Sequence, residues 1–137
     1  MNKMKQEDKE LLLKDLCARL PYGVKVESVF INPETKEHKS CGIEVFDATS
    51  MLMIRDGLGE FKPYLFPLSS TSEEIMDEIY NETGIYDIDV DSPVHIEVGT
   101  TFEDLTKMIH ILHKYHIDYR GLIPMDLAID ATDKNIY

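Results

Sequence analysis

The sequence predicts an α+β protein, with a single domain over residues 1–137 that combines a mostly antiparallel sheet of about five strands with about three helices packed on it. Two observations predict this class. Apolar residues recur at helical spacing in some stretches and alternate with polar residues in others. In addition, 43% of the 137 residues are hydrophobic, which is enough to bury a core without support from disulfides or a metal.

The first half of the chain is predicted to begin with a helix and a hairpin. Leucines at helical spacing indicate a helix from about residue 5 to residue 20. Pro21 and Gly23 follow directly and are expected to end it. Residues 24–30 then alternate between apolar and charged side chains, which is typical of a strand. A turn containing Pro33 is expected to connect this strand to a second one at residues 41–45.

Three further segments are expected between residues 51 and 84. Residues 51–54 are predicted to form a third short strand. Residues 61–68 contain two prolines and are therefore expected to run extended, as an edge strand or as a strap across the core. Thr71 and Glu74 match a capping box, which predicts a helix that ends near Gly84.

The second half is predicted to contain two strands, a helix and a packed tail. Residues 86–90 and 94–98 show the alternation of strands. A second capping box, Thr100 to Glu103, predicts a third helix. Its core-facing stripe is expected to consist of Phe102, Leu105, Ile109 and Leu112, and the apolar segment from Ile117 to Tyr137 is expected to pack back on the domain.

The charge of the chain limits its partners. There are 26 acidic and 14 basic residues, which give a formal net charge of -12. This excess opposes direct binding to nucleic acid or to an anionic membrane, and no apolar stretch has the length of a transmembrane helix. We expect a cytoplasmic protein. One alternative is an acidic decoy that imitates nucleic acid and blocks a DNA-binding protein, which would require the carboxylates to gather on one face.

The histidines near the C-terminal end are the candidates for a metal site. His110, His113 and His116 are spaced by three residues, so neighbouring imidazoles on a helix could share a metal ion. The first and third diverge by roughly 120 degrees, because three residues fall short of a full turn. His116 is expected inside the apolar stripe and His113 at its margin, as core residues; the alternative is a small metal-dependent enzyme that uses these histidines.

Other signatures of chemistry fail. Asp87, Asp89 and Asp91 resemble the start of a calcium loop, but Ser92 and Val98 stand where glycine and glutamate are needed. These aspartates are therefore predicted to form a solvated strand face. Cys17 and Cys41 form no CxxC pair and are expected to be reduced and half-buried. No catalytic residue and no cofactor is predicted.

The remaining candidates for binding lie mostly in the C-terminal segment. They are an aromatic and charged group formed by Tyr64, Asp118, Tyr119, Arg120 and Asp126. Arg120 is one of three arginines in the chain, and a guanidinium can hold the carboxylate of a partner in a bidentate manner. The alternative, which we favour, is an internal pair of Arg120 with Asp118 or Asp126 that fixes the tail.

Four stretches resemble a known group of proteins: Leu11 to Val24 (LLLKDLCARLPYGV), Cys41 to Ile43, Lys62 to Ser70 (KPYLFPLSS) and His116 to Asp130 (HIDYRGLIPMDLAID). Together they resemble a family of small uncharacterised proteins of gut Bacteroidetes and of their phages and mobile elements. The resemblance covers a third to a half of the chain. It implies a cytosolic setting and an origin in phages or mobile elements, and it carries no activity, cofactor or site residue.

These observations favour a non-enzymatic protein that acts through an unknown protein partner or as a homodimer. The absence of a catalytic motif and the presence of strands that can offer a free edge are the reasons for this expectation.

Overall fold

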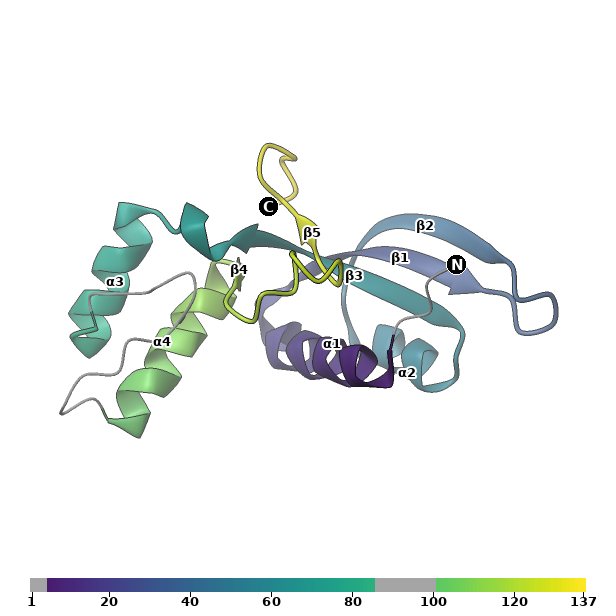
Figure 1. The fold of residues 1–137 in the computed structure, drawn as a ribbon, viewed down its shortest axis with the longest axis horizontal. Coiled ribbons are helices and arrows are strands. Elements are labelled where there is room, and N and C mark those ends of the chain that lie inside the picture. The colour runs from purple at the N-terminus through teal and green to yellow at the C-terminus, as the bar shows by residue number, and fades with distance from the viewer. Residues whose placement is uncertain (1–4, 86–100) are drawn as a thin grey trace.

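The computed structural model describes residues 5–85 and 101–137, and within these it confirms the α+β class with four helices and a five-stranded, mostly antiparallel sheet. The helices and the strands follow one another along the chain as Figure 1 shows. They are α1 (Gln6–Arg19), β1 (Lys25–Ile31), β2 (His38–Val45), α2 (Ala48–Arg55), β3 (Gly59–Pro67), α3 (Glu73–Thr83), α4 (Phe102–Lys114), β4 (Ile117–Asp118) and β5 (Ile129–Asp130).

The predicted helix and hairpin at the start are confirmed. Helix α1 is followed by a short 3₁₀ turn, and Gly23 then adopts the left-handed conformation that ends a helix. Strands β1 and β2 pair antiparallel, with a β-bulge at the extra residue Cys41. The turn between them is held by Asn32, whose side-chain oxygen accepts hydrogen bonds from the backbone N–H groups of Glu34 and Thr35.

The segment predicted to run extended at residues 61–68 does so, since Gly59–Pro67 form β3, but its expected place as an edge strand or strap is wrong, because β3 lies inside the sheet. The strand order is β2-β1-β3-β4, and β5 also pairs with β3. Residues 59–63 pair antiparallel with β1, whereas residues 64–67 pair parallel with β5 and β4. Pro63 and Pro67 thus each lie at the last pair of a ladder, where a missing N–H donor interrupts no further pairing.

The predicted strand at residues 51–54 is a helix. Asp47 caps α2, because its carboxylate accepts a hydrogen bond from the backbone N–H of Ser50 while the Ser50 hydroxyl accepts one from the backbone N–H of Asp47. This capping box satisfies the free donors of the first turn. It decides the conformation of a short apolar run whose length fits either a strand or a helix.

The starts of the later helices are each displaced by one residue from the prediction. The cap of α3 is Ser72 rather than Thr71, and Thr71 instead donates to the carbonyl of Leu68. The capping box of α4 is Thr101 with Asp104 rather than Thr100 with Glu103. The predicted stripe of α4 is also partly wrong, since Phe102 is 85% exposed and the buried positions are Met108, Ile111, Leu112 and His113.

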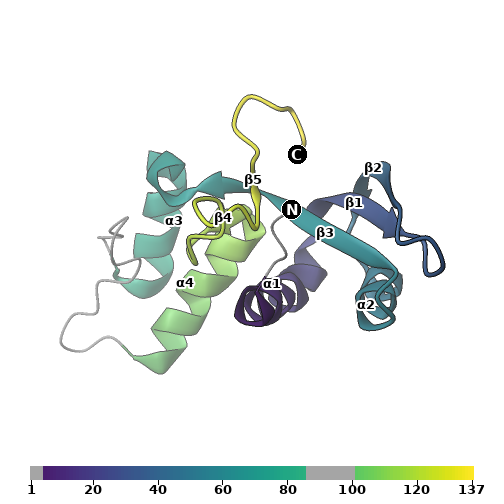
Figure 2. The ribbon, with the colours of Figure 1, turned by 45° about the vertical axis from the view of Figure 1, so that its right-hand side comes forward.

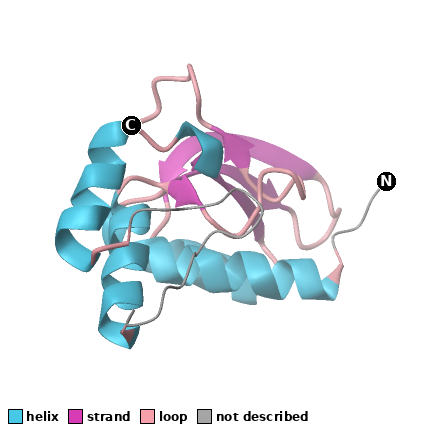
Figure 3. Ribbon diagram, turned by 60° about the vertical axis from the view of Figure 1, so that its left-hand side comes forward, coloured by secondary structure: helices cyan, strands magenta, loops and turns pink. Residues whose placement is uncertain are grey.

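Two groups of buried side chains form the core. One lies between the sheet and the layer of α1 and α2, and Figures 1 and 2 both show these two helices on the same face of the sheet. The other joins α3, α4 and β4 at one end of the molecule. Helix α1, which contributes to the first group, runs along one side of the strands in Figure 3. The first contains Leu12, Leu16, Val26, Phe61 and Leu65, and the second contains Ile79, Met108, Ile111, Leu112 and Ile117.

The C-terminal segment packs on the domain, as predicted. Leu122, Leu127 and Ala128 belong to the first core group, and Ala131 is also buried. The strands predicted at 86–90 and 94–98, with Asp87, Asp89 and Asp91, lie outside the described residues.

Candidate functional site

A buried carboxylate with two guanidiniums joins α1 to the C-terminal segment. Asp15 and Arg19 lie one turn apart on α1, and their side chains are fully buried. Nε of Arg19 donates to one oxygen of Asp15 at 2.8 Å, and Nε of Arg120 donates to the other at 3.0 Å. Asp15 therefore binds the guanidiniums of two elements that are far apart in the sequence.

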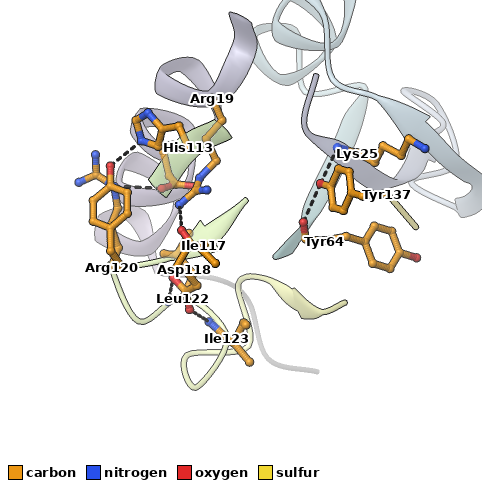
Figure 4. Close-up of polar contacts among 12 residues, drawn as sticks. Arg19, Lys25, Tyr64, His113, Ile117, Asp118, Arg120, Leu122, Ile123 and Tyr137 are labelled. Carbon is orange, nitrogen blue, oxygen red and sulfur yellow. Dashed lines mark hydrogen bonds and ion pairs between the residues drawn. The ribbon is translucent and has the colours of Figure 1, made fainter. Parts of the chain in front are cut away.

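Arg19 also connects the two core groups. Its Nη2 donates to the backbone carbonyl of Ile117 at 2.7 Å, a contact that Figure 4 shows. Among the described residues, Nη1 of Arg19 has no hydrogen-bond partner. The cluster thus holds two cationic side chains and one carboxylate. Its hydrogen bonds connect α1 to β4 within the same chain.

The predicted partners of Arg120 were wrong, although an internal pair was expected. Asp118 is buried and accepts hydrogen bonds from the backbone N–H groups of Leu122 and Ile123, both at 2.9 Å. Asp126 is exposed and pairs with Lys62 at 3.2 Å. Each oxygen of Asp118 thus accepts a hydrogen bond from the turn that follows it, whereas Arg120 pairs with Asp15.

Replacing Asp118 with alanine is expected to lower the free energy of unfolding by about 1–3 kcal/mol, because two backbone N–H groups lose their acceptor, one of them buried. Urea unfolding followed by circular dichroism measures this change. Asp126→Ala is the matched control, since this carboxylate is 92% exposed and should contribute little. Equal effects of the two substitutions would contradict the role given to Asp118.

The structure does not bring the five predicted binding residues together, since Asp126 pairs with Lys62 and Tyr64 lies apart from Asp118 and Arg120. The side chain of Tyr64 is buried, and burial together with the nearby carboxylate of Glu27 raises the pKa of its hydroxyl. Its backbone carbonyl accepts a hydrogen bond from the hydroxyl of Tyr137 at 2.7 Å. Figure 4 shows Tyr64 and Tyr137 well apart from Asp118 and Arg120. Tyr119 is close to the cluster, with its ring beneath the guanidiniums of Arg19 and Arg120.

The three histidines face three different tyrosines. His110 forms a hydrogen bond with the hydroxyl of Tyr22, and Nε2 of His113 forms one with the hydroxyl of Tyr119 at 2.7 Å. The helix ends at Lys114, so His116 lies beyond it rather than within its apolar stripe, and its ring stacks on Tyr137. In the described ranges 5–85 and 101–137, no three His, Cys, Asp or Glu side chains are placed to hold a metal ion.

Two of these histidines are neutral at neutral pH. Burial lowers the pKa of His113 to about 4, and the charges of Arg19, Arg120 and His110 act in the same direction. Burial also lowers the pKa of His116 to about 4, with contributions from Arg19 and Lys25. Burial raises the pKa of the Tyr119 hydroxyl. The His113–Tyr119 contact is therefore a hydrogen bond between neutral groups.

A shallow cleft of about 320 Å³ lies between α3 and α4. His110, Glu78 and Glu82 are among its lining residues, but His113 and His116 are not. Glu78 is held by Lys114 at 3.1 Å and by the hydroxyl of Tyr115, and the hydrogen bond from Lys114 is the main reason why its pKa is lowered. The described part of this cleft thus offers one histidine, the paired carboxylate of Glu78 and the carboxylate of Glu82.

Strand β2 forms an exposed edge of the sheet. All eight residues of β2 are exposed, including Cys41, which was expected to be half-buried. Ile43 is 53% and Val45 is 51% exposed. Among the described residues β2 pairs only with β1, and Figure 1 shows it at the outer edge of the sheet. Its free edge offers unpaired backbone donors and acceptors.

Comparison with known proteins gives no match: no family model fits the chain, and no curated protein or solved structure is significantly similar to it. Among the described residues, no helix is both long and apolar enough to cross a membrane.

Proposed function

We propose that this protein is a non-enzymatic protein-interaction module of the cytoplasm, which binds an extended polypeptide segment by strand addition at the free edge of β2. One observation carries the proposal: a strand of eight residues is exposed along its whole length and has a single strand partner among the described residues. Backbone hydrogen bonds to such an edge supply affinity, and alternate side chains supply specificity.

The side chains of β2 support this proposal. Ile43 and Val45 are paired with Glu27 and Lys25 of β1, on the face of the sheet opposite to α1 and α2. They give an incoming strand an apolar contact on that face, while Lys39 and Glu44 offer charges on the other. An exposed strand edge with apolar side chains is a site to which proteins add a further strand.

The internal contacts of the other candidate residues also favour β2. Arg120, Asp118 and His113 are each bound to groups of the same chain, so they hold the C-terminal segment in place. The resemblance to proteins of gut Bacteroidetes and their phages supports a cytoplasmic setting.

Replacing Ile43 with lysine is expected to weaken binding of any strand at this edge by roughly tenfold, because a charge replaces the central apolar contact. The measurement combines capture by immobilised protein with hydrogen exchange of the β2 amides in the captured complex. A partner bound at the edge slows exchange in β2, and the variant loses that partner.

The matched control is Leu52→Lys. Leu52 lies on α2 and is 49% exposed, close to the 53% of Ile43, so it reports the effect of a new surface lysine away from the edge. It should retain the partner. Captured proteins that leave the exchange of β2 unchanged, or that bind Ile43→Lys as well as the natural protein, would contradict the proposal.

A further inference from the structure

We infer that the strand which occupies the edge of β2 is β2 of a second copy of this chain, antiparallel to the first and related to it by a two-fold axis through Gly42. This inference rests on the proposed function and names its partner. It follows from the register of β2 on β1 and from the order of charges along β2.

The pairing with β1 defines the regular positions of β2. Gly42 lies opposite Ser28, and the bulge leaves Cys41 without a partner on β1. Ser40 and Ile43 then lie opposite Val29 and Glu27, one step to either side of Ser28. When the bulged residue Cys41 is left out, three residues of β2 precede Gly42 and three follow it. Gly42 is therefore the midpoint of the regularly paired positions.

The same counting continues to the ends of the strand. Lys39 and Glu44 lie opposite Phe30 and Val26, each two steps from Ser28. His38 and Val45 lie opposite Ile31 and Lys25, each three steps away. A two-fold axis through Gly42 thus places Lys39 of one copy opposite Glu44 of the second copy, and it does so twice.

The faces of the strands agree in this arrangement. Side chains directly opposite each other in an antiparallel pair project on the same face. Lys39 and Glu44 share the face of the buried Val26, and Ser40 and Ile43 share the other. Without the bulge, residues 39 and 44 would be five positions apart and would project on opposite faces. The bulge brings the two opposite charges to the same face.

The centre of the contact is also compatible with close approach. Gly42 has a φ of +82°, a conformation that glycine adopts without strain, and a Cβ atom built there would meet nothing within 4 Å. The extra residue Cys41 of each copy lies between Ser40 and Gly42 and faces the regular residues Gly42 and Ile43 of the other copy, so each strand keeps in the dimer the bulge that it already has on β1. A net charge of -12 opposes the association of two copies, which makes the paired lysines important.

Strand β2 contributes eight residues per copy to this contact. A standard stable interface of about 1,600 Å² uses about 20–30 residues on each side, so this contact is smaller. The dimer is therefore expected to be weak and to depend on concentration. Sedimentation velocity over a wide range of protein concentration measures its dissociation constant.

Reversal of single charges tests the register. Lys39→Glu and Glu44→Lys each create two pairs of like charges, and each is expected to raise the dissociation constant of the dimer by about tenfold, which corresponds to about 1.4 kcal/mol. The double variant Lys39→Glu/Glu44→Lys exchanges the two charges and should restore the natural value. Lys36→Glu, a similar change in the hairpin turn outside β2, is the matched control and should have little effect.

Zero-length cross-linking between amines and carboxylates supplies a second measurement. Within one strand Lys39 and Glu44 lie opposite Phe30 and Val26, four residues apart on β1, so they are separated by about 13 Å at a rise of about 3.3 Å per residue. A peptide in which Lys39 is joined to Glu44 must therefore come from two copies. It is expected in the dimer fraction and not in the monomer fraction.

The outcomes separate this inference from the proposed function. A protein that stays monomeric at every concentration would overturn the pairing of two copies, but protection of β2 by another captured protein would still support strand addition at the edge. A dimer that is insensitive to the charge reversals and that lacks the Lys39–Glu44 cross-link would overturn the register. Loss of both self-association and partner capture would overturn both.

Discussion

Replacing Asp15 with asparagine is expected to lower the free energy of unfolding by roughly 3–5 kcal/mol. Among the described residues, Asp15 is the only carboxylate that binds Arg19 and Arg120, and the substitution removes its charge while it preserves the shape of the side chain. Arg19 is fully buried, so its charge would remain in the protein interior without a counter-ion. Urea unfolding monitored by circular dichroism gives the free-energy difference.

Asp56→Asn is the matched control for this experiment. Asp56 also pairs with an arginine, Arg55, but the two side chains are 50% and 69% exposed. Solvent screens such a pair, so its loss is expected to have little effect on the free energy of unfolding. If Asp15→Asn were no more harmful than Asp56→Asn, the buried cluster would not be a determinant of stability.

A double replacement distinguishes the loss of charge pairing from the loss of packing as the cause of a lower stability. Exchanging Asp15 and Arg19 together for leucine and methionine removes both buried charges, which is often less harmful than removing one. We expect the double variant to be more stable than Asp15→Asn. The comparison tests whether the cost of the single substitution comes from an unpaired charge.

The elements that the sequence predicted correctly depend on local signals. Helix α1 is ended by Pro21 and Gly23, the hairpin of β1 and β2 is set by the turn at Asn32, and Gly84 ends α3 in the left-handed conformation. Each of these signals acts within a few residues. A reader of the sequence can therefore find them without knowledge of the tertiary structure.

The errors concern features that depend on distant contacts or on a single cap. The run at 51–54 is too short for its apolar pattern to separate strand from helix, and Asp47 decides the matter. Strands β4 and β5 have two residues each, so no alternation can show them. The prolines of residues 61–68 favour an edge strand or a strap across the core, but pairing with β4 and β5 puts the segment inside the sheet.

The candidate site was predicted in part, and the reason is similar. Arg120 could be chosen because arginine is rare in the chain, but its partner is 105 positions away. The spacing of Asp15 and Arg19 by four residues on a predicted helix was a signal for the other half of the cluster. The free edge of β2 could not be identified, because exposure of a strand depends on which other strands pair with it.

The buried cluster and the free edge are expected to act independently. Asp15 lies on α1, whereas Lys39 lies on the outermost strand. Substitutions that are distant and share no partner usually have additive effects. Asp15→Asn should thus change stability with little effect on dimerisation of the folded protein, and Lys39→Glu should do the reverse.

Stability is also expected to fall as the pH is lowered from about 7 to about 4. His113 has a pKa of about 4 in the folded protein, against an ordinary value of 6.5. Between these values the unfolded chain binds a proton that the folded protein does not bind, so stability is complete above pH 6.5 and is lost progressively on acidification. Below pH 4 the folded protein also binds the proton, and this loss reaches its limit.

The expected loss from His113 alone is on the order of 3 kcal/mol. His113 faces Arg19 of α1, Arg120 of the C-terminal segment and His110 of its own helix, so a positive charge there would meet two guanidiniums in a buried environment. His113→Gln removes the titration and can still form a hydrogen bond with the Tyr119 hydroxyl. Its unfolding free energy should therefore depend less on pH between 6.5 and 4 than that of the natural protein. An equal slope for His113→Gln and the natural protein would show that the proton is not excluded from His113.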